Sequence, residues 1–262
     1  MKIAVCVKYV PDAAADRRFA ADHTVDRVGV DGMLSELDEY AVEQALQMKD
    51  AGDPEATEVV AVTVGPEVAR AAILKSLQMG ADAGVHVLDD AVHGSDAVAT
   101  SLILAEAVKR QQADVVLCGM ASTDGSMSVV PAMVAERLGL PQVTFSSEIT
   151  VDGETVRGRR DGDVATEVVE AKAPVLISVT DQANEPRYPS FKGIMAAKKK
   201  PVETVSLADL GIDAGEVGAA SAWTAVERIE ARPPRSAGTV VVDEDGSGAA
   251  ALVEFLAAQK FI

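Results

Sequence analysis

The chain has 262 residues, of which 48% are hydrophobic, so it is long enough to bury a sizeable core as one large domain or as one domain with a long arm. Its 41 acidic residues against 24 basic residues give a net charge of −17, which argues against general binding to nucleic acids or anionic membranes, because both need clustered positive charge. No apolar run reaches about 18 residues and the start lacks a small-residue cleavage site, so we expect a cytoplasmic protein without membrane insertion.

Strands and helices alternate in the first half of the chain. Apolar runs predict strands at residues 2–10, 58–64, 84–88 and 114–118, and amphipathic patterns predict helices at 35–52, at 66–80 and from residue 95. Ser35 followed by Asp38 is typical of a helix start, and Ser95 is the expected cap of the third helix. This alternation predicts an α/β fold with a doubly wound, mostly parallel, Rossmann-like sheet.

A loop of small residues, GMASTDGS at 119–126, follows the fourth predicted strand and precedes a helix that ends near Leu138. Backbone N–H groups and hydroxyls in such a loop can contact a phosphate, and the helix dipole favours the anion. Ligands of open parallel sheets lie outside the carboxyl ends of the strands, where Val7, Val64 and Gly119 would converge. A plain connecting turn is the alternative, because no Gly-Lys-Ser/Thr phosphate motif is present.

Cys6 and Cys118 each lie in an apolar run, which predicts two buried thiols rather than a disulfide. Neither has metal-ligand spacing with any of the three scattered histidines, His23, His86 and His93. The sequence also shows no catalytic triad and no nucleophile elbow. We therefore expect no metal site and no catalytic residues of the chain's own.

The second half changes character at Pro141. Shorter alternating segments predict strands at residues 143–151, 154–158, 165–170 and 174–180, which extend the sheet. From residue 206 the chain shows little periodicity until a terminal amphipathic helix at 249–258. We therefore divide the chain into an α/β domain, 1–205, and a C-terminal arm, 206–262, that wraps a partner.

Residues 184–201, NEPRYPSFKGIMAAKKKP, combine aromatic, methionine and basic side chains. The two prolines at 186 and 189 disfavour helix, which places Tyr188 and Phe191 on an ordered loop. A short helix is expected to start at Ile194 and to end in three lysines before Pro201. A basic and partly apolar island in an acidic chain indicates a contact site, with a solvated charged face as the alternative.

This string closely resembles the C-terminal signature of the beta subunit of electron transfer flavoproteins. The segments KIAVCVKYVPD, DEYAVEQAL, VVAVTVGP, GMASTDGS and AQKFI also fall in that family's order along nearly the whole chain. The resemblance implies an electron carrier subunit in a heterodimer with an alpha subunit that holds most of the FAD. Electrons would come from flavin dehydrogenases such as the acyl-CoA dehydrogenases of fatty acid β-oxidation, and would pass to the respiratory chain through an electron transfer flavoprotein–quinone oxidoreductase.

The resemblance also implies which residues dock the partners. Phe191 falls on the hydrophobic anchor position of the recognition loop, which is a leucine in the mammalian proteins. The implied docking residues are Arg187, Tyr188, Phe191, Ile194, Met195, Lys198 and Lys199. Lys192 and the lysines at 198–200 are expected to steer acidic partners. In the family's second signature an acidic residue contacts the flavin domain of the alpha subunit, and Asp161 matches it best, with Asp163 as second choice.

In the family, the loop after the fourth strand holds an AMP that is structural rather than catalytic. Carried over by position, AMP would contact Cys6, Ser35, Leu37, Asp38, Val64, Gly119, Ser122, Thr123, Asp124, Gly125, Ser126, Ser128, Val129 and Val130. Many relatives have an Asn or Gln late in this loop, so a second FAD, as in electron-bifurcating members, is an alternative ligand. An ATP-binding or ATP-sensing protein of the same broad α/β group is the alternative function. Ala13 and Leu37 stand where mammalian relatives contribute aromatic contacts to the flavin, so we expect the chain alone to bind FAD poorly.

Overall fold

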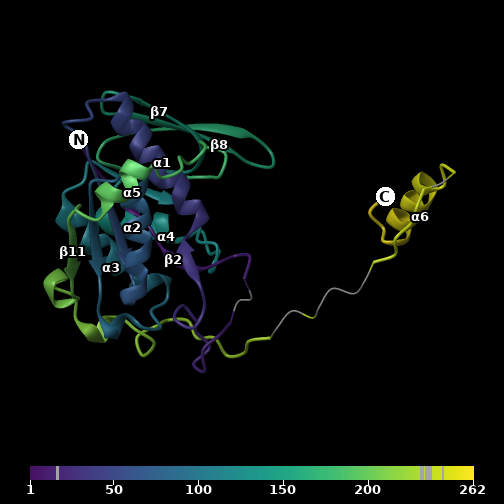
Figure 1. Ribbon diagram of the computed structural model, residues 1–262, viewed down its shortest axis with the longest axis horizontal. Helices are drawn as coiled ribbons and strands as arrows, with labels where there is room; N and C mark the ends of the chain where they lie inside the picture. Colours follow the sequence, from purple (N-terminus) through teal and green to yellow (C-terminus); the bar gives the residue numbers. More distant parts are fainter. Residues whose placement is uncertain (16–17, 231–232, 234–237, 244) are drawn as a thin grey trace. The chain divides into compact units, whose positions relative to one another are not determined.

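The computed structural model describes the whole chain except residues 16–17, 231–232, 234–237 and 244 (Figure 1). The chain divides into two compact units, Met1–Glu227 and Arg228–Ile262. Within the described ranges, every helix is too short or too polar to cross a membrane.

The first unit is built around one nine-stranded sheet. In spatial order its strands are β11 (Val202–Val205), β5 (Ala83–Val87), β4 (Glu58–Val64), β1 (Lys2–Cys6), β6 (Val115–Gly119), β10 (Val175–Val179), β7 (Gln142–Asp152), β8 (Thr155–Asp161) and β9 (Thr166–Lys172). The strands from β11 to β7 pair in parallel, whereas β8 and β9 continue the sheet in antiparallel fashion. The predicted α/β fold with a mostly parallel sheet is thus confirmed.

Helices cover both faces of this sheet (Figure 1). One face carries α1 (Glu36–Ala51) and α2 (Arg70–Met79), the latter preceded by the 3-10 turn η1 (Glu67–Ala69), and the other carries α3 (Ala97–Gln111) and α4 (Val130–Leu138). Side chains alternate along β1: Ile3 packs with α1 and α2, and Ala4 packs with α3 and α4. Because both faces are covered, the central strands are continuous hydrophobic runs.

The order of the strands determines where a ligand can bind. The chain runs from β1 through β4 to β5 on one side of β1, and α3 then returns it to β6 on the other side. The strand order therefore reverses between β1 and β6. In open parallel sheets, ligands bind outside the carboxyl ends of the strands at such a reversal.

The predicted strand at residues 2–10 is in fact two strands. The N–H group of Val7 still donates to the carbonyl of Val62 at 2.9 Å, but that of Lys8 turns to the carboxylate of Asp38 at 2.8 Å. The chain therefore leaves the main sheet, and β2 (Tyr9–Pro11) pairs instead with β3 (Gly32–Leu34) in a two-stranded antiparallel sheet. The cap of α3 is also one residue later than predicted, since Asp96 rather than Ser95 accepts the N–H of Ala99.

The boundary expected at residue 206 differs from the boundary between the two units. Leu207, Ile212 and Val217 are buried in the core of the face covered by α3 and α4, so residues 206–227 belong to the first unit. This stretch contains the short 3-10 turns η3 (Ala208–Leu210) and η4 (Ala214–Glu216). Each turn is too short to show a periodic pattern of hydrophobic residues in the sequence. The sequence likewise did not predict β11, which follows Pro201 and pairs with β5.

Three further elements complete the described chain. They are η2 (Asp90–Val92), α5 (Phe191–Ala197) and α6 (Gly248–Ala258). The helix α6 lies in the second unit and none of its residues is buried, so Leu252, Val253 and Phe255 are all exposed.

Candidate functional site

The loop predicted to bind a phosphate lies where the sheet topology places a ligand. In the register of the sheet, Cys6 stands between Val62 of β4 and Cys118 of β6, so the ends of these three strands are side by side. The loop that follows Gly119 leads into α4, and α1 starts at the same edge after Ser35. The structure therefore brings together the strand ends, the helix start and the loop that the sequence assigned to one site.

The start of α1 packs closely against the end of β6. A Cβ atom on Gly119 would lie 2.6 Å from Asp38 Oδ1 and 2.7 Å from the carbonyl oxygen of Leu37, so only glycine permits this approach. Burial raises the pKa of Asp38 to about 7, although hydrogen bonds from the N–H groups of Lys8 and Gly119 oppose the shift. The requirement for glycine is therefore set by the packing of α1, before any ligand is considered.

The side chain of Ser35 has a different partner from the one that the sequence predicts. It makes no capping hydrogen bond to its own helix, and its Oγ accepts the N–H of Thr123 at 3.4 Å. The side chains of Ser35 and Asp38 thus connect α1 to the loop and to the segment that follows β1. This links three segments of the candidate site through two short polar side chains.

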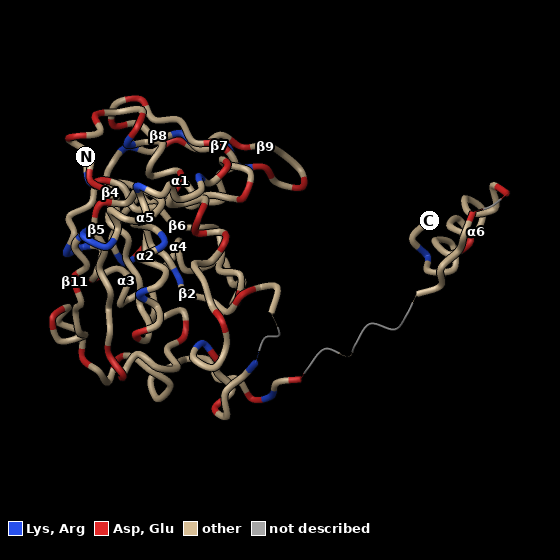
Figure 2. Tube along the Cα trace, in the orientation of Figure 1, with Lys and Arg blue, Asp and Glu red and all other residues tan. Residues whose placement is uncertain are grey.

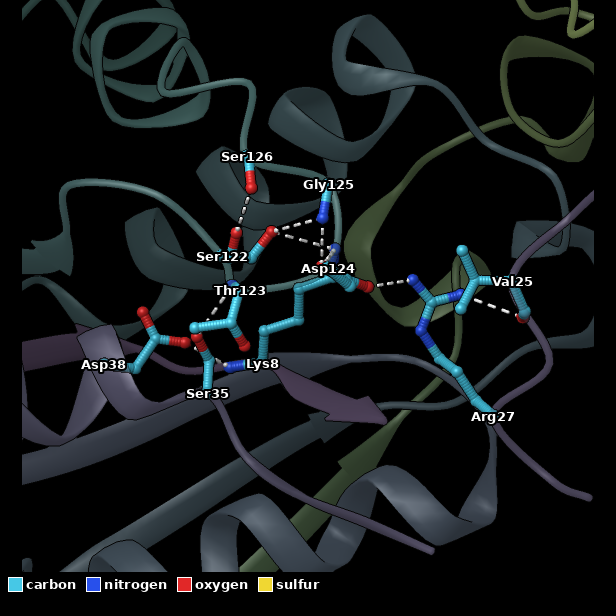
Figure 3. A network of polar contacts seen from close by, with 10 residues as sticks. All are labelled: Lys8, Val25, Arg27, Ser35, Asp38, Ser122, Thr123, Asp124, Gly125 and Ser126. Carbon is cyan, nitrogen blue, oxygen red and sulfur yellow. Dashed lines mark hydrogen bonds and ion pairs between the residues drawn. The ribbon is translucent and has the colours of Figure 1, made fainter. Parts of the chain in front are cut away.

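Two cations meet at Asp124 in the centre of the loop (Figure 3). Lys8 Nζ lies 2.8 Å from Asp124 Oδ1 and 3.3 Å from Ser122 Oγ, and Arg27 pairs with the other carboxylate oxygen of Asp124. The Asp124 side chain is only 1% exposed. Burial acts to raise the pKa of Asp124, but Lys8, the hydrogen bond with Ser122 and Arg27 together outweigh it and hold that pKa well below its usual range. The three groups together carry one net positive charge, which suits an anion.

The sequence did not predict Lys8 or Arg27. Lys8 lies within the apolar run at residues 2–10, which predicts a single strand, and Arg27 lies in the irregular stretch between this run and the first helix. Only the turn of the chain at Lys8 and the return of residues 18–28 to the site bring both cations to Asp124. A positive charge directly after a strand end was the one signal that could have indicated Lys8.

The backbone of the loop is tightly turned (Figure 3). The N–H of Gly125 donates to Asp124 Oδ1 at 2.6 Å, and that of Ser126 donates to the carbonyl of Ser122 at 3.0 Å. Ser126 and Ser128 both have positive φ, 51° and 58°, which non-glycine residues rarely adopt. Val129 gives α4 no side-chain cap, so a ligand oxygen could satisfy the first N–H groups of that helix.

The remaining predicted contacts are distributed around this loop. Cys6 and Cys118 are buried free thiols on neighbouring strands, and the pKa of Cys118 is raised by a hydrogen bond with Cys6 and by burial. Val64 ends β4, and Val130 begins α4. Among the described residues, no group of three His, Cys, Asp or Glu side chains could hold a metal ion.

The recognition segment 184–201 is exposed at its aromatic positions. Tyr188 is 94% exposed and Phe191 is 81% exposed, so Phe191 is not a core residue beneath the loop. The helix α5 begins at Phe191 instead of Ile194, because the hydroxyl oxygen of Ser190 caps it by accepting the N–H of Gly193 at 3.0 Å. The expectation of a loop position for Phe191 was therefore wrong, since it lies on the first turn of a helix.

The basic side chains of this segment do not all face solvent. Arg187 pairs with Glu43 and Asp50 of α1, and Lys200 donates to the carbonyl oxygens of Leu77 and Ala81. Lys198 and Lys199 are exposed. Figure 2 shows Lys and Arg beside α5 on a chain in which Asp and Glu predominate. Lys200 is therefore used within the chain, contrary to the expectation that it steers partners.

Asp161 lies at the end of β8, on the antiparallel extension of the sheet. Its carboxylate accepts hydrogen bonds from Ser147 Oγ at 2.5 Å, Thr166 Oγ1 at 2.8 Å and Arg159 at 3.1 Å. The bond from Ser147 is the main cause that lowers the pKa of Asp161 below its usual range. The residue therefore holds the hairpin together and keeps its negative charge at the surface.

The chain is similar to known proteins along almost its whole length. A family model described as "Electron transfer flavoprotein domain" matches residues 22–210. Proteins named "Electron transfer flavoprotein subunit beta" from Mycobacterium tuberculosis (strain ATCC 25618 / H37Rv) and Mycobacterium leprae are 44% and 45% identical to it, each over 99% of both chains. The protein of that name from Megasphaera elsdenii is 35% identical over 100% of both chains. The chain therefore belongs to the electron transfer flavoprotein family, as a member of its beta-subunit branch.

Proposed function

We propose that this beta subunit pairs with an alpha subunit in the cytoplasm and accepts electrons from flavin dehydrogenases such as acyl-CoA dehydrogenases. The pair then passes the electrons to an electron transfer flavoprotein–quinone oxidoreductase, which delivers them to the respiratory chain. The observation that carries the proposal is the exposure of Tyr188 and Phe191 next to the exposed lysines of the same segment. Large aromatic side chains in water are disfavoured unless a partner covers them, and they are typical anchors of interfaces.

We assign AMP to the loop 119–130, because the groups around it suit a phosphate. Lys8 and Arg27 supply the positive charge that the phosphate needs, and the hydroxyls of Ser122 and Ser126 and the uncapped start of α4 add donors. In this proposal, these groups take over the phosphate contacts that an Asn or Gln late in the loop would make. A structural AMP would then hold β1, α1 and the loop in one arrangement, and take no part in electron transfer.

The flavin belongs mainly to the alpha subunit in this proposal. FAD supplies the redox chemistry when it is bound, and the beta subunit contributes orientation and docking. Asp161 keeps its charge at the hairpin surface, where it would contact the flavin domain. The exposed apolar side chains of α6 would cover part of the alpha subunit, as expected of a wrapping arm.

The test is to express the chain alone and together with the alpha subunit of the same organism. The pair should form a stable yellow heterodimer whose flavin is reduced by an acyl-CoA dehydrogenase and its substrate, while the folded chain alone should hold little FAD. Stoichiometric FAD on the isolated chain would instead support a bifurcating type with a second flavin. A colourless homodimer that hydrolyses or exchanges ATP would support the ATP-binding alternative.

A further inference from the structure

The recognition segment is tied to α1 on its upstream side. Arg187 directs its Nε and one terminal nitrogen to the two carboxylate oxygens of Glu43, at 2.7 and 3.0 Å, and its backbone N–H also donates to Glu43 at 3.1 Å. Asn184 donates from its amide to the carbonyl of Tyr40 at 3.1 Å. The side chain of Glu43 is only 5% exposed, so this is a nearly buried, bidentate pair. Three contacts to one carboxylate leave Arg187 little freedom.

Asp50 adds a second acidic partner from the same helix. Its carboxylate lies 2.9 Å from Arg187 Nη2, the same terminal nitrogen that donates to Glu43. The hydrogen bond with Glu43 is the main cause that raises the pKa of Arg187 above its usual value. The guanidinium is thus matched by two carboxylates within the chain. It has little positive charge left to offer an acidic partner protein.

The downstream side of the segment is tied to the end of α2. Lys200 Nζ lies 3.0 Å from the carbonyl oxygen of Leu77 and 2.5 Å from that of Ala81, where the last carbonyls of a helix lack partners. A Cβ atom on Gly193 would lie 2.6 Å from the carbonyl oxygen of Gln78, so α5 touches the backbone at this helix end. Ala197 of α5 is buried in the core. The short helix is therefore seated on the core rather than held only by its own hydrogen bonds.

The exposed side chains lie between these two attachments. Tyr188, Phe191 and Met195 are at least half exposed, whereas Arg187 before them and Lys200 after them bond to α1 and to the end of α2. A seven-residue helix is too short to be stable by itself in water, so its orientation depends on the attachments. Holding a binding surface in its bound arrangement before contact raises affinity, because less freedom is lost on docking.

We infer that Arg187 and Lys200 are positioning residues that fix the recognition segment at both ends, so that the affinity for electron donors depends on them although neither contacts the donor. The inference rests on the proposed docking function of Phe191. It divides the basic residues of the segment into two kinds. Arg187 and Lys200 attach the segment to the chain, and the exposed Lys192, Lys198 and Lys199 are available for steering.

The first experiment compares Lys200→Met with Lys199→Met in the heterodimer with the alpha subunit. Both variants remove one charge from the same run and keep a long apolar stem. With an acyl-CoA dehydrogenase as donor, Lys200→Met should raise the KM for the heterodimer about tenfold, with kcat unchanged and with the same ratio at low and high salt. Lys199→Met should show a smaller change that disappears at high salt, since exposed charges are screened. Identical, salt-sensitive effects of the two variants would overturn the inference.

The second experiment measures the attachment directly. Hydrogen exchange of the Gly193 and Ile194 amides, which both bond to Ser190, should accelerate about tenfold in Arg187→Lys and in Glu43→Gln, while exchange in the central strands stays unchanged. The double variant should equal either single variant, because the two side chains act as one pair. Additive effects on KM, or a raised KM with unchanged exchange, would mean that Arg187 contacts the donor and would overturn the inference.

Phe191→Ala separates this inference from the function on which it rests. If Phe191→Ala leaves the KM unchanged, the docking function itself is wrong. If Phe191→Ala raises the KM but Lys200→Met and Arg187→Lys do not, docking is right and the positioning role is wrong.

Discussion

Replacement of Phe191 by alanine should weaken docking without loss of stability. Phe191 is 81% exposed, so almost its entire side chain is available to be buried by a partner. Burying a phenylalanine contributes about 1.5–3 kcal/mol, and truncation of an interface anchor costs about 2 kcal/mol, roughly 30-fold in affinity. The free energy of unfolding should change by less than about 0.5 kcal/mol, because the side chain has few contacts to lose and the Ser190 cap of α5 remains.

The assay is the rate of flavin reduction by an acyl-CoA dehydrogenase at limiting concentrations of the heterodimer, together with its Tm. Phe191→Leu is the matched control, because it keeps an apolar anchor at the position where mammalian relatives have leucine, and it should retain most of the activity. A wild-type rate for Phe191→Ala would refute the docking role. A Tm lowered by several degrees would also refute it, because it would show that Phe191 has a structural role. In a chain of this size, a loss of about 1 kcal/mol of stability lowers the Tm by about 2–4 °C.

Four other substitutions probe the loop after β6 and its surroundings. Gly119→Ala should destabilise the chain by about 1–3 kcal/mol and lower its Tm, because the new Cβ would overlap Asp38 and Leu37. Gly125→Ala is the matched control and should leave the Tm unchanged, because its Cβ would come no closer than 3.5 Å to Ser122 Oγ. Gly125→Val should fold normally but lose AMP and weaken subunit association, as measured by nucleotide content after denaturation; normal AMP content would mean that the loop is only a connector. Burial raises the pKa of Asp38 to about 7 in the folded state, so between about pH 4 and pH 7 the folded chain holds a proton that the unfolded chain has lost. The stability that this group contributes should therefore fall as the pH rises from about 4 to 7. Asp38→Asn should flatten that dependence in denaturant titrations at several pH values, and an unchanged dependence would assign it to other groups.

Much of the fold could be predicted from local patterns. The strand at 58–64 has the same bounds in the structure, and the first helix differs by about one residue at each end, because buried runs and amphipathic stripes mark such elements strongly. The short, irregular elements could not be predicted in this way. Leu207, Ile212 and Val217 flank the 3-10 turns after residue 205 and are buried at intervals of five residues, which match neither the helical nor the strand period. This stretch therefore has the sequence pattern of an arm although it packs in the core.

The candidate site divides along the same line. The loop at 119–126 and the start of α1 were predictable, because each has a composition typical of its role. The cations were not, since Lys8 and Arg27 come to Asp124 only through the path of the chain after β1. Glu43 gave no signal either, because an acidic residue in an amphipathic helix is normally solvated, and its pairing with Arg187 joins positions 144 residues apart.

The nucleotide content of the purified heterodimer tests the proposed function most directly. The complex is denatured, and the released nucleotides are separated and quantified against the protein concentration. We predict one FAD and one AMP per heterodimer, the first from the alpha subunit and the second from the loop that contains Asp124. Two FAD molecules without AMP, or ATP in a colourless protein, would contradict this assignment.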